Sequence, residues 1–372
     1  MKILHLLYES KGDYFGIGGV GIRAYEIYRH LKDRHDITLL CKKYPEAKDG
    51  DIEGLRHIFV GTESKNLTKT LFSYAYQASR FVKKFGNRYD VIIEDFSPAI
   101  PTFLHTLTKK PVVLQVQGYT GWLYLRKYNP AYATTLYVLE RLRPMFYDNF
   151  IFISAETVKR FSLKGRRYIE VIPNGVSSEL LTVTPGDGDY ILYLGRIDIY
   201  GKGLDILLSA YSEFFKSFPD IRLAIAGDGR DRNQFEAMLM NLSVDIRKNI
   251  ELIGWVNGER KREIISKALF CVFPSRHETQ GISVLEAMAC GKAVIVSDIP
   301  EFRYVLNAES GLSFVNGDSS SLAQSMREMV TSNRRMDMGE KGRNSVLNLT
   351  WYKVAGRFEG FLFGLQKRSA TL

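Results

Sequence analysis

Residues 269–297, LFCVFPSRHETQGISVLEAMACGKAVIVS, decide the fold of this chain. The segment begins with an apolar run, crosses a polar loop to Gly281, continues with helical spacing and ends in a second apolar run, AVIVS. Two apolar strands joined through a helix form a βαβ unit, whose strands are parallel. Since both runs are apolar throughout, we expect helices to cover both faces of their sheet.

The same alternation extends outward in both directions. In the first half the predicted strands are 2–7, 36–41, 56–60, 90–94, 111–116 and 150–154, and the predicted helices are 20–33, 66–86, 98–107, 129–147 and 156–163. In the second half the predicted strands are 190–195, 221–227, 250–254, 269–274 and 293–297. A turn-rich stretch near 173–188 separates the two series. The pattern predicts an α/β protein of two Rossmann-like, doubly wound domains facing each other across a cleft, 1–172 and 173–348.

The remaining segment, 349–372, has apolar residues at helical spacing. It is either a helix that packs back on the first domain or a cap on the second.

Composition narrows the class of protein. The chain has 372 residues, more than one core usually serves. No apolar run is long enough to span a bilayer, and the three dispersed cysteines fit neither a disulfide framework nor a zinc spacing. We therefore expect a cytoplasmic protein.

Charge is distributed unevenly along the chain. Residues 1–175 hold 27 Lys and Arg against 17 Asp and Glu, so this half carries the whole +10 excess. An anionic membrane surface or an acidic substrate fits such a half, and no nucleic-acid motif accompanies it.

The stretch GIGGVG, 16–21, matches the G-x-G-x-x-G pattern of dinucleotide-binding enzymes. Eight residues separate it from the first strand, however, and the second strand ends in Lys42 and Lys43 where an acidic residue is expected. An NAD(P)-dependent dehydrogenase, with the lysines at a 2′-phosphate, is therefore a minor alternative. Gly18 and Gly19 precede a helix, where backbone amides can approach an anion.

A second glycine-containing turn follows the strand that begins the second half. Its sequence, GRIDIYGKG, places Arg196 and Lys202 six residues apart at the carboxyl end of a strand. Two cations on such a turn can hold a diphosphate from two sides, and the following helix N-terminus adds partial positive charge.

The opening segment contributes two carboxylates. Glu278 follows the strand directly, and Glu286 lies eight residues later within the helix. The amides of Gly281, Ile282 and Ser283 form the start of that helix and suit a phosphate. Carboxylates are poor phosphate ligands but good acceptors for sugar hydroxyls. We therefore interpret Glu286 as a ribose ligand and Glu278 as a ligand of the transferred group.

These motifs together resemble glycosyltransferase family 4, of the retaining GT-B type. The resemblance rests on GRIDIYGKG, on the Glu-x7-Glu spacing within ETQGISVLEAMACGKAVIVSD, on IPNGV at 172–176 and on the glycine loop. It covers nearly the whole chain and is strongest over 190–300. It implies a glycosyltransferase that moves a sugar from a nucleotide-diphosphate donor to a sugar or lipid-linked saccharide acceptor.

The resemblance also implies roles for individual residues. Arg196 and Lys202 would contact the donor diphosphate, Glu286 the ribose and Glu278 the sugar. The backbone near Val256 would border the base. No metal or other cofactor is implied, because the two cations neutralise the leaving group.

One position departs from the family's pattern. Gln117, in QVQGYTG after the fifth strand, stands where the family often has histidine before glycine. Glutamine can hydrogen-bond a sugar hydroxyl but cannot act as an acid or base. A nucleotide-sugar epimerase and a non-catalytic nucleotide-sugar-binding protein therefore remain as alternatives.

The helix predicted at 66–85 has an apolar stripe accompanied by Lys69, Arg80, Lys83 and Lys84. It is either a basic amphipathic helix that rests on anionic lipid or a helix that covers the sheet with a basic outer side.

Overall fold

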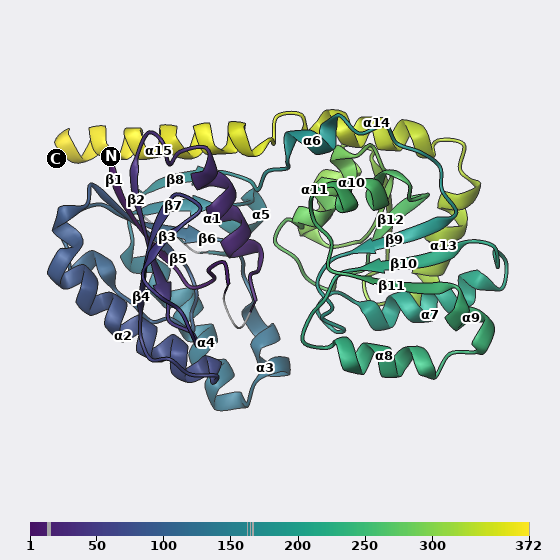
Figure 1. Cartoon of the computed structure of the whole chain (residues 1–372), viewed down its shortest axis with the longest axis horizontal. Coiled ribbons are helices and arrows are strands. Elements are labelled where there is room, and N and C mark those ends of the chain that lie inside the picture. The colour runs from purple at the N-terminus through teal and green to yellow at the C-terminus, as the bar shows by residue number, and fades with distance from the viewer. Residues whose placement is uncertain (13–15, 162, 164, 166, 372) are drawn as a thin grey trace. The chain divides into compact units, whose positions relative to one another are not determined.

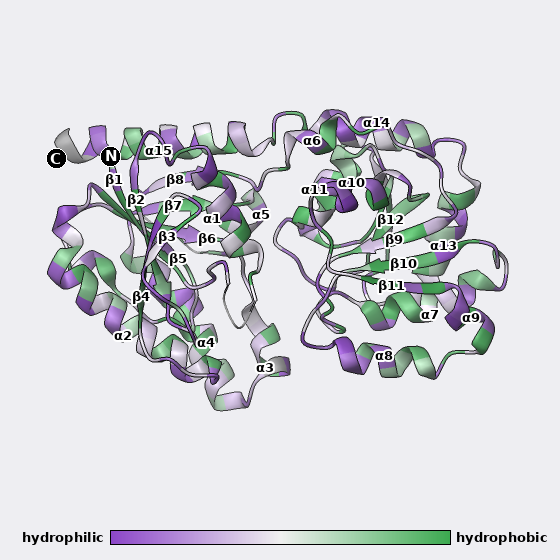
Figure 2. Cartoon of the chain, in the orientation of Figure 1, coloured by the Kyte–Doolittle hydropathy of each residue, from purple (hydrophilic) through white to green (hydrophobic). Residues whose placement is uncertain are grey.

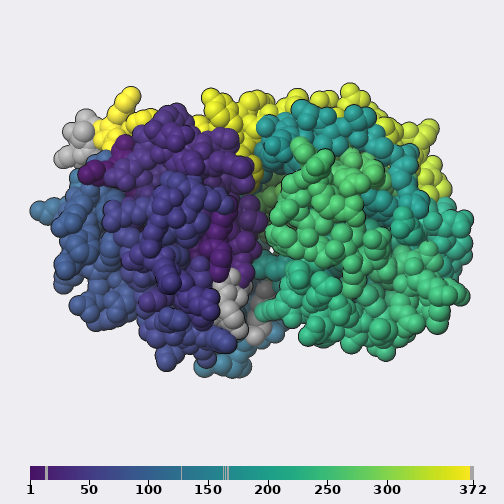
Figure 3. All heavy atoms as spheres, viewed as in Figure 1, coloured from purple at the N-terminus to yellow at the C-terminus, as the bar shows by residue number. Residues whose placement is uncertain are grey.

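The computed structural model describes residues 1–12, 16–161, 163, 165 and 167–371. The chain divides into two compact units (Figure 1 and Figure 3). The first comprises Met1–Asn174 and Trp351–Leu372, and the second comprises Gly175–Thr350. The sequence placed the boundary two residues earlier, at 172/173.

The first unit contains a sheet with the order β3-β4-β2-β1-β5-β6-β7-β8. All neighbouring strands are parallel except β3, which pairs antiparallel with β4. The strands are β1 (Lys2–Leu7), β2 (Asp36–Lys42), β3 (Gly50–Ile52), β4 (Leu55–Val60), β5 (Val91–Asp95), β6 (Val112–Val116), β7 (Asn149–Phe152) and β8 (Tyr168–Val171). Strand order reverses between β1 and β5, which makes the carboxyl ends of these strands a topological switch point.

The helices of this unit are α1 (Gly19–Arg29), α2 (Leu67–Phe85), α3 (Tyr124–Lys127), α4 (Pro130–Leu142), α5 (Ala155–Arg160) and α15 (Trp351–Thr371). Among the described residues of this unit, four short 3₁₀ helices join them: η1 (Gly86–Arg88), η2 (Leu104–Thr106), η3 (Gly121–Leu123) and η4 (Arg143–Phe146). Helix α15 packs in the core of the first unit, where Val354, Phe358 and Leu362 are buried with Ile3 and Tyr28.

The second unit has a six-stranded sheet with the order β11-β10-β9-β12-β13-β14, parallel throughout. Its strands are β9 (Tyr190–Leu194), β10 (Arg222–Ala226), β11 (Ile250–Gly254), β12 (Phe270–Phe273), β13 (Val294–Ser297) and β14 (Gly311–Phe314). Counted within the unit, this is the 3-2-1-4-5-6 order of nucleotide-binding α/β folds. Figure 2 shows that the strands are largely apolar, as expected for a sheet covered on both faces.

Nine helices surround the second sheet in the described part of the chain. They are α6 (Ser178–Leu181), α7 (Leu204–Phe215), α8 (Arg232–Met240), α9 (Val244–Lys248), α10 (Gly258–Ser266), α11 (Ile282–Ala289), α12 (Arg303–Asn307), α13 (Ser319–Thr331) and α14 (Arg335–Val346). A 3₁₀ helix, η5 (Pro300–Phe302), precedes α12.

One helix predicted from the sequence is absent, and the structure distinguishes the two roles left open for another. Residues 98–107 form no α-helix and contain only the turn η2, because Pro101 lacks an amide hydrogen and disfavours helix at the residue before it. Of the two roles left open for the helix at 66–85, the structure supports the one that covers the sheet, since Tyr74 and Ala78 of the apolar stripe of α2 are buried in the core that α2 forms with the sheet. An apolar stripe of helical period can pack against a sheet or contact lipid equally well, so the sequence could not distinguish these two roles.

Candidate functional site

The switch point of the second unit brings two predicted motifs together. Strands β9 and β12 are neighbours, and strand order reverses between them. The turn 195–203 leaves the carboxyl end of β9, and the loop 274–281 leaves the carboxyl end of β12. Both loops therefore lie at the edge of the sheet where ligands of doubly wound folds bind.

Direct hydrogen bonds fix the two loops to one another. The Arg276 amide donates to the Gly201 carbonyl at 3.1 Å, and the Arg276 guanidinium binds both carboxylate oxygens of Asp205 at 2.8 and 2.6 Å. At Gly203 the backbone has a φ of +66°, and a Cβ there would overlap the carbonyl oxygen of Pro274. Glycine at 203 is thus required by the close approach of the two loops.

Lys202 and Glu278 form an ion pair across these loops. Their side chains are only 23% and 17% exposed. Glu278 also accepts a hydrogen bond from the Thr279 amide at 3.3 Å. The structure therefore joins one of the predicted diphosphate cations directly to the predicted sugar ligand, a contact that the sequence did not suggest.

Arg196 stands at the end of β9 and is exposed. Its backbone carbonyl accepts a hydrogen bond from the Tyr193 hydroxyl at 2.8 Å, which fixes the start of the turn. Burial, reinforced by the negative charges of Glu278 and Asp198, raises the pKa of Tyr193 well above its usual value. The Tyr193 hydroxyl therefore stays protonated, and its hydrogen bond fixes the backbone of Arg196.

Glu286 is held by a residue that sequence reasoning missed. Lys261 of α10 lies 2.8 Å from the Glu286 carboxylate, and the two side chains are 26% and 14% exposed. Twenty-five residues separate them, so no local pattern predicts the contact. Each predicted glutamate is thus paired with a lysine from a neighbouring segment.

The N-terminus of α11 has the predicted geometry. Gly281 is its N-cap with a φ of +74°, and Ile282 and Ser283 occupy the first turn, where helical amides have no preceding carbonyl partner. The Tyr304 hydroxyl donates to the Gln280 carbonyl at 2.6 Å and fixes the approach to the cap. Burial beside Glu278 raises the pKa of Tyr304 well above its usual value.

The segment predicted to border the base lies at the end of β11. The side chain of Val256 is 7% exposed and packs in the core, so only its backbone can face a ligand. Its neighbour Trp255 is 60% exposed. An aromatic ring on this loop is a candidate contact for a flat base, and sequence reasoning passed over it.

In the first unit the backbone amides of the glycine loop bind a carboxylate of the chain itself. The amides of Gly18 and Gly21 donate to one oxygen of Glu9, at 2.9 and 3.1 Å. Gly19 begins α1 directly after the Gly18 cap. A phosphate at the Gly18 amide would have to displace the Glu9 carboxylate, a competitor that the G-x-G-x-x-G pattern did not reveal.

Gln117 lies beside a buried polar network at the first unit's switch point. One oxygen of Asp95 accepts hydrogen bonds from the side-chain amides of Gln117 and Gln115, at 2.8 and 2.7 Å. The other oxygen lies 2.9 Å from Nε2 of His5, whose Nδ1 lies 2.7 Å from the Tyr28 hydroxyl. Asp95 thus fixes the nitrogen end of the Gln117 amide and leaves its oxygen as an acceptor for a hydroxyl.

The chain has Asp-Gly-Asp triplets at 49–51 and 187–189, whose aspartates make structural contacts. Asp49 accepts the Phe59 amide at 2.8 Å, and Asp51 accepts the Gly54 amide at 2.7 Å. Asp187 pairs with Arg335 at 2.8 Å. Within the described ranges, no group of three or more His, Cys, Asp and Glu side chains is arranged to hold a metal ion.

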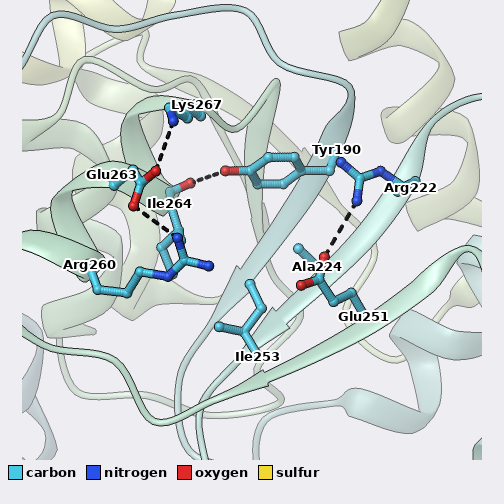
Figure 4. A pocket seen from close by; sticks show the side chains of 9 residues that line it. All are labelled: Tyr190, Arg222, Ala224, Glu251, Ile253, Arg260, Glu263, Ile264 and Lys267. Atoms are coloured by element: carbon cyan, nitrogen blue, oxygen red, sulfur yellow. Dashed lines mark hydrogen bonds and ion pairs between the residues drawn. The ribbon is translucent and has the colours of Figure 1, made fainter.

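A hollow of about 180 Å³ opens between α10 and the strands β9, β10 and β11 (Figure 4). Tyr190, Arg222 and Glu251 line it from near the amino ends of their strands. Arg222 is hydrogen-bonded to Glu251, and Glu263 on the other wall is paired with Lys267. This hollow is separate from the loops at the carboxyl ends of the strands.

Two family models match the chain in succession. Residues 17–180 match the model described as Glycosyltransferase Family 4, and residues 182–345 match the model described as Glycosyl transferases group 1.

The chain belongs to glycosyltransferase family 4.

Curated relatives of this family 4 protein include phosphatidyl-myo-inositol mannosyltransferases. The protein from Mycobacterium tuberculosis is 36% identical over 142 residues, which is 36% of each chain. The match therefore spans about a third of that relative's length. The protein from Mycolicibacterium smegmatis is 26% identical over 307 residues, 78% of this chain and 75% of the relative.

Solved structures agree on the GT-B fold. Sucrose-phosphate synthase from Thermosynechococcus elongatus superposes with a TM-score of 0.80 at 20% identity, covering 99% of this chain and all of that one. The lipopolysaccharide glycosyltransferase WaaG gives 0.73 at 17% identity, over 98% and 100% of the two chains. In the described part of this family 4 chain, no helix combines the length and apolar character needed to cross a membrane.

Proposed function

We propose that the protein is a retaining, metal-independent glycosyltransferase that moves a hexose from a nucleotide-diphosphate donor to a sugar or glycolipid acceptor. The observation that carries this proposal is the pairing of Lys202 with Glu278 and of Lys261 with Glu286 around the α11 N-terminus. A nucleotide-diphospho-sugar contains what this arrangement can bind: an anion, a ribose and a hexose.

The donor diphosphate is assigned to Arg196, Lys202 and the first amides of α11. Fixed cations and oriented amides stabilise the charge that develops on the departing diphosphate. The C1–O bond to the phosphate breaks as the acceptor oxygen bonds to C1 on the same face. The acceptor proton passes to a donor phosphate oxygen, so the electron and proton balance closes without a protein nucleophile or metal.

The hydroxyl-bearing groups are assigned to the two carboxylates, Glu286 for ribose and Glu278 for the transferred sugar. Gln117 supplies an amide oxygen on the acceptor side, oriented by Asp95. The names of the mannosyltransferase relatives and of WaaG support a lipid-linked acceptor. We accordingly propose a cytoplasmic enzyme, peripheral at the inner face of the membrane.

Thermal-shift titration with UDP, GDP and ADP in the presence of EDTA tests the donor site. Stabilisation by one nucleoside diphosphate, reduced in Lys202→Met, is expected. The dehydrogenase alternative would be supported instead if only NAD(H) or NADP(H) stabilised the protein. Detection of a transferred sugar on any acceptor separates the transferase from an epimerase and from a binding protein.

A further inference from the structure

We propose that the exposed surface formed by η3, α3, α4 and η4 is the face on which this protein docks to an anionic lipid bilayer. We call it the α4 surface. Its exposed apolar side chains are Trp122, Leu125, Tyr128, Val138, Leu142, Met145 and Phe146, together with Phe103 of the preceding loop, which contacts Phe146. The inference rests on the proposed function in one respect, that the acceptor is linked to a lipid. It adds the surface by which the enzyme reaches that acceptor.

The apolar residues of α4 and η4 form a continuous exposed stripe. Exposed positions recur at 131, 135, 138, 142 and 145, a spacing that returns to one face of a helix. Val138, Leu142 and Met145 are 42%, 50% and 46% exposed. The opposite side holds Ala133 and Leu136, which pack with Tyr124 in a small core of their own. The buried side of α4 therefore packs on this small core, and its apolar stripe is exposed to solvent.

Aromatic contacts extend the stripe at both ends. Trp122, 65% exposed, stacks on Tyr137 with ring centroids 4.1 Å apart, and the Arg141 guanidinium lies 5.1 Å from the centroid of the Tyr137 ring. Phe146, 58% exposed, meets Phe103 edge to face at 5.9 Å. Tryptophan and arginine beside exposed aliphatic groups are typical of surfaces that enter the headgroup region of a bilayer.

A buried carboxylate holds this segment in shape. The oxygens of Glu140, which is 1% exposed, accept the Thr120 and Gly121 amides at 2.8 and 2.7 Å and the Tyr124 hydroxyl at 2.9 Å. The turn that carries Trp122 is thus fixed to α4. Apolar side chains on a braced turn keep their exposed area and lose little conformational entropy on binding.

Charge favours an anionic bilayer over a neutral partner. Between residues 121 and 146 the sequence has four Lys and Arg, of which Arg143 is buried and paired with Glu94, and its one acidic residue, Glu140, is buried. Arg126 and Arg141 are exposed beside the stripe. Cations near a membrane surface add an attraction to acidic lipids that salt weakens.

The α4 surface is also close along the chain to the predicted acceptor-side residue. Gln117 follows β6, and the braced turn that begins at Thr120 leads directly to Trp122. A lipid-linked acceptor extracted beneath this turn would have a short path to Gln117. The residues left exposed on α2, such as Phe72 and Tyr76, lack that connection.

Vesicle flotation tests the inference with a matched pair of variants. Trp122→Ser/Phe146→Ser removes two aromatic groups from the α4 surface, and Phe72→Ser/Tyr76→Ser removes two comparably exposed groups from α2. Wild type should float with phosphatidylglycerol-containing vesicles at low salt and much less with pure phosphatidylcholine. The α4-surface variant should partition at least about tenfold more weakly, while the α2 variant stays within about twofold of wild type.

Nucleoside-diphosphate binding and the melting temperature are measured on the same preparations, to show that each variant is folded. Equal flotation of wild type and the α4-surface variant, or no flotation of wild type, would overturn the inference while leaving the donor site intact. A wild-type dimer that the α4-surface variant loses, without vesicle binding, would assign the surface to a second copy instead. Flotation without any nucleotide binding would count against the proposed function and not against the docking surface.

Discussion

Replacing Glu278 by glutamine should have opposite effects on two properties of the donor site. In the structure this carboxylate pairs with Lys202, which we assign to the donor diphosphate. Glu278→Gln keeps the shape of the side chain and removes its charge. We expect the variant to bind the free nucleoside diphosphate more tightly than wild type and to turn over the nucleotide sugar more slowly.

The gain in affinity follows from electrostatics. Two unit charges about 5 Å apart interact by about 1 to 3 kcal/mol at effective dielectric constants between about 80 and 20. The Lys202 and Glu278 side chains are 23% and 17% exposed, so solvent screens part of this repulsion between carboxylate and phosphate. We take the lower end, about 1 kcal/mol, which lowers the Kd of the nucleoside diphosphate about fivefold.

The loss of turnover follows from the sugar contact. A hydrogen bond from a hydroxyl to a charged carboxylate stabilises more than one to a neutral amide, by about 1 kcal/mol or more. At saturating nucleotide sugar the tighter diphosphate contact is present in both the ground state and the transition state, so we expect kcat of Glu278→Gln to fall by the lost contact alone, about fivefold.

Isothermal titration and sugar-release kinetics measure the two effects, with two comparison variants. Glu286→Gln lies eight residues away in the same segment and should weaken nucleoside-diphosphate binding, because it is assigned to the ribose. Lys202→Met should weaken it at least about tenfold, because a charged phosphate contact is lost. If Glu278→Gln weakened nucleotide binding as much as Glu286→Gln does, the separate roles of the two carboxylates would be refuted.

Three further changes test the scaffold. Gly203→Ala should lower the melting temperature and nucleotide affinity together, because its Cβ would overlap the Pro274 carbonyl; an unchanged melting temperature would contradict the close approach. Asp95→Ala, which removes the acceptor of the Gln117 amide, should raise the acceptor KM more than the donor KM, and equal changes in the two constants would argue for a general loss of structure. Burial lowers the pKa of His57, so the unfolded chain binds more protons as pH falls through the usual histidine range near 6.5, and stability should fall there. A His57→Gln variant should lose stability less steeply between pH 7.5 and 5.5, and parallel melting curves would contradict that cause.

The sequence was most informative where chemistry follows strand ends. Alternating apolar strands and helices predicted both sheets, and the GRIDIYGKG turn and the Glu278–Glu286 spacing placed the candidate residues at one switch point. These features are local, because each motif immediately follows or precedes an apolar run.

What the sequence did not reveal depends on packing between distant segments. Lys261 meets Glu286 only because α10 and α11 pack in the folded unit. The Gly18 amide is directed at the Glu9 carboxylate, and a pattern of glycines cannot distinguish that carboxylate from a phosphate. The strand β14 was missed since its sequence, GLSF, is short and only partly buried.

Proton NMR of nucleotide-sugar turnover in EDTA tests the central claim most directly. Wild type should release a nucleoside diphosphate from a hexose nucleotide and form a glycoside with the anomeric configuration of the donor when a lipid-saccharide extract is present. Lys202→Met should reduce that signal at least about tenfold. An inverted product, a strict metal requirement, or a Lys202→Met rate equal to wild type would contradict the mechanism proposed for this site.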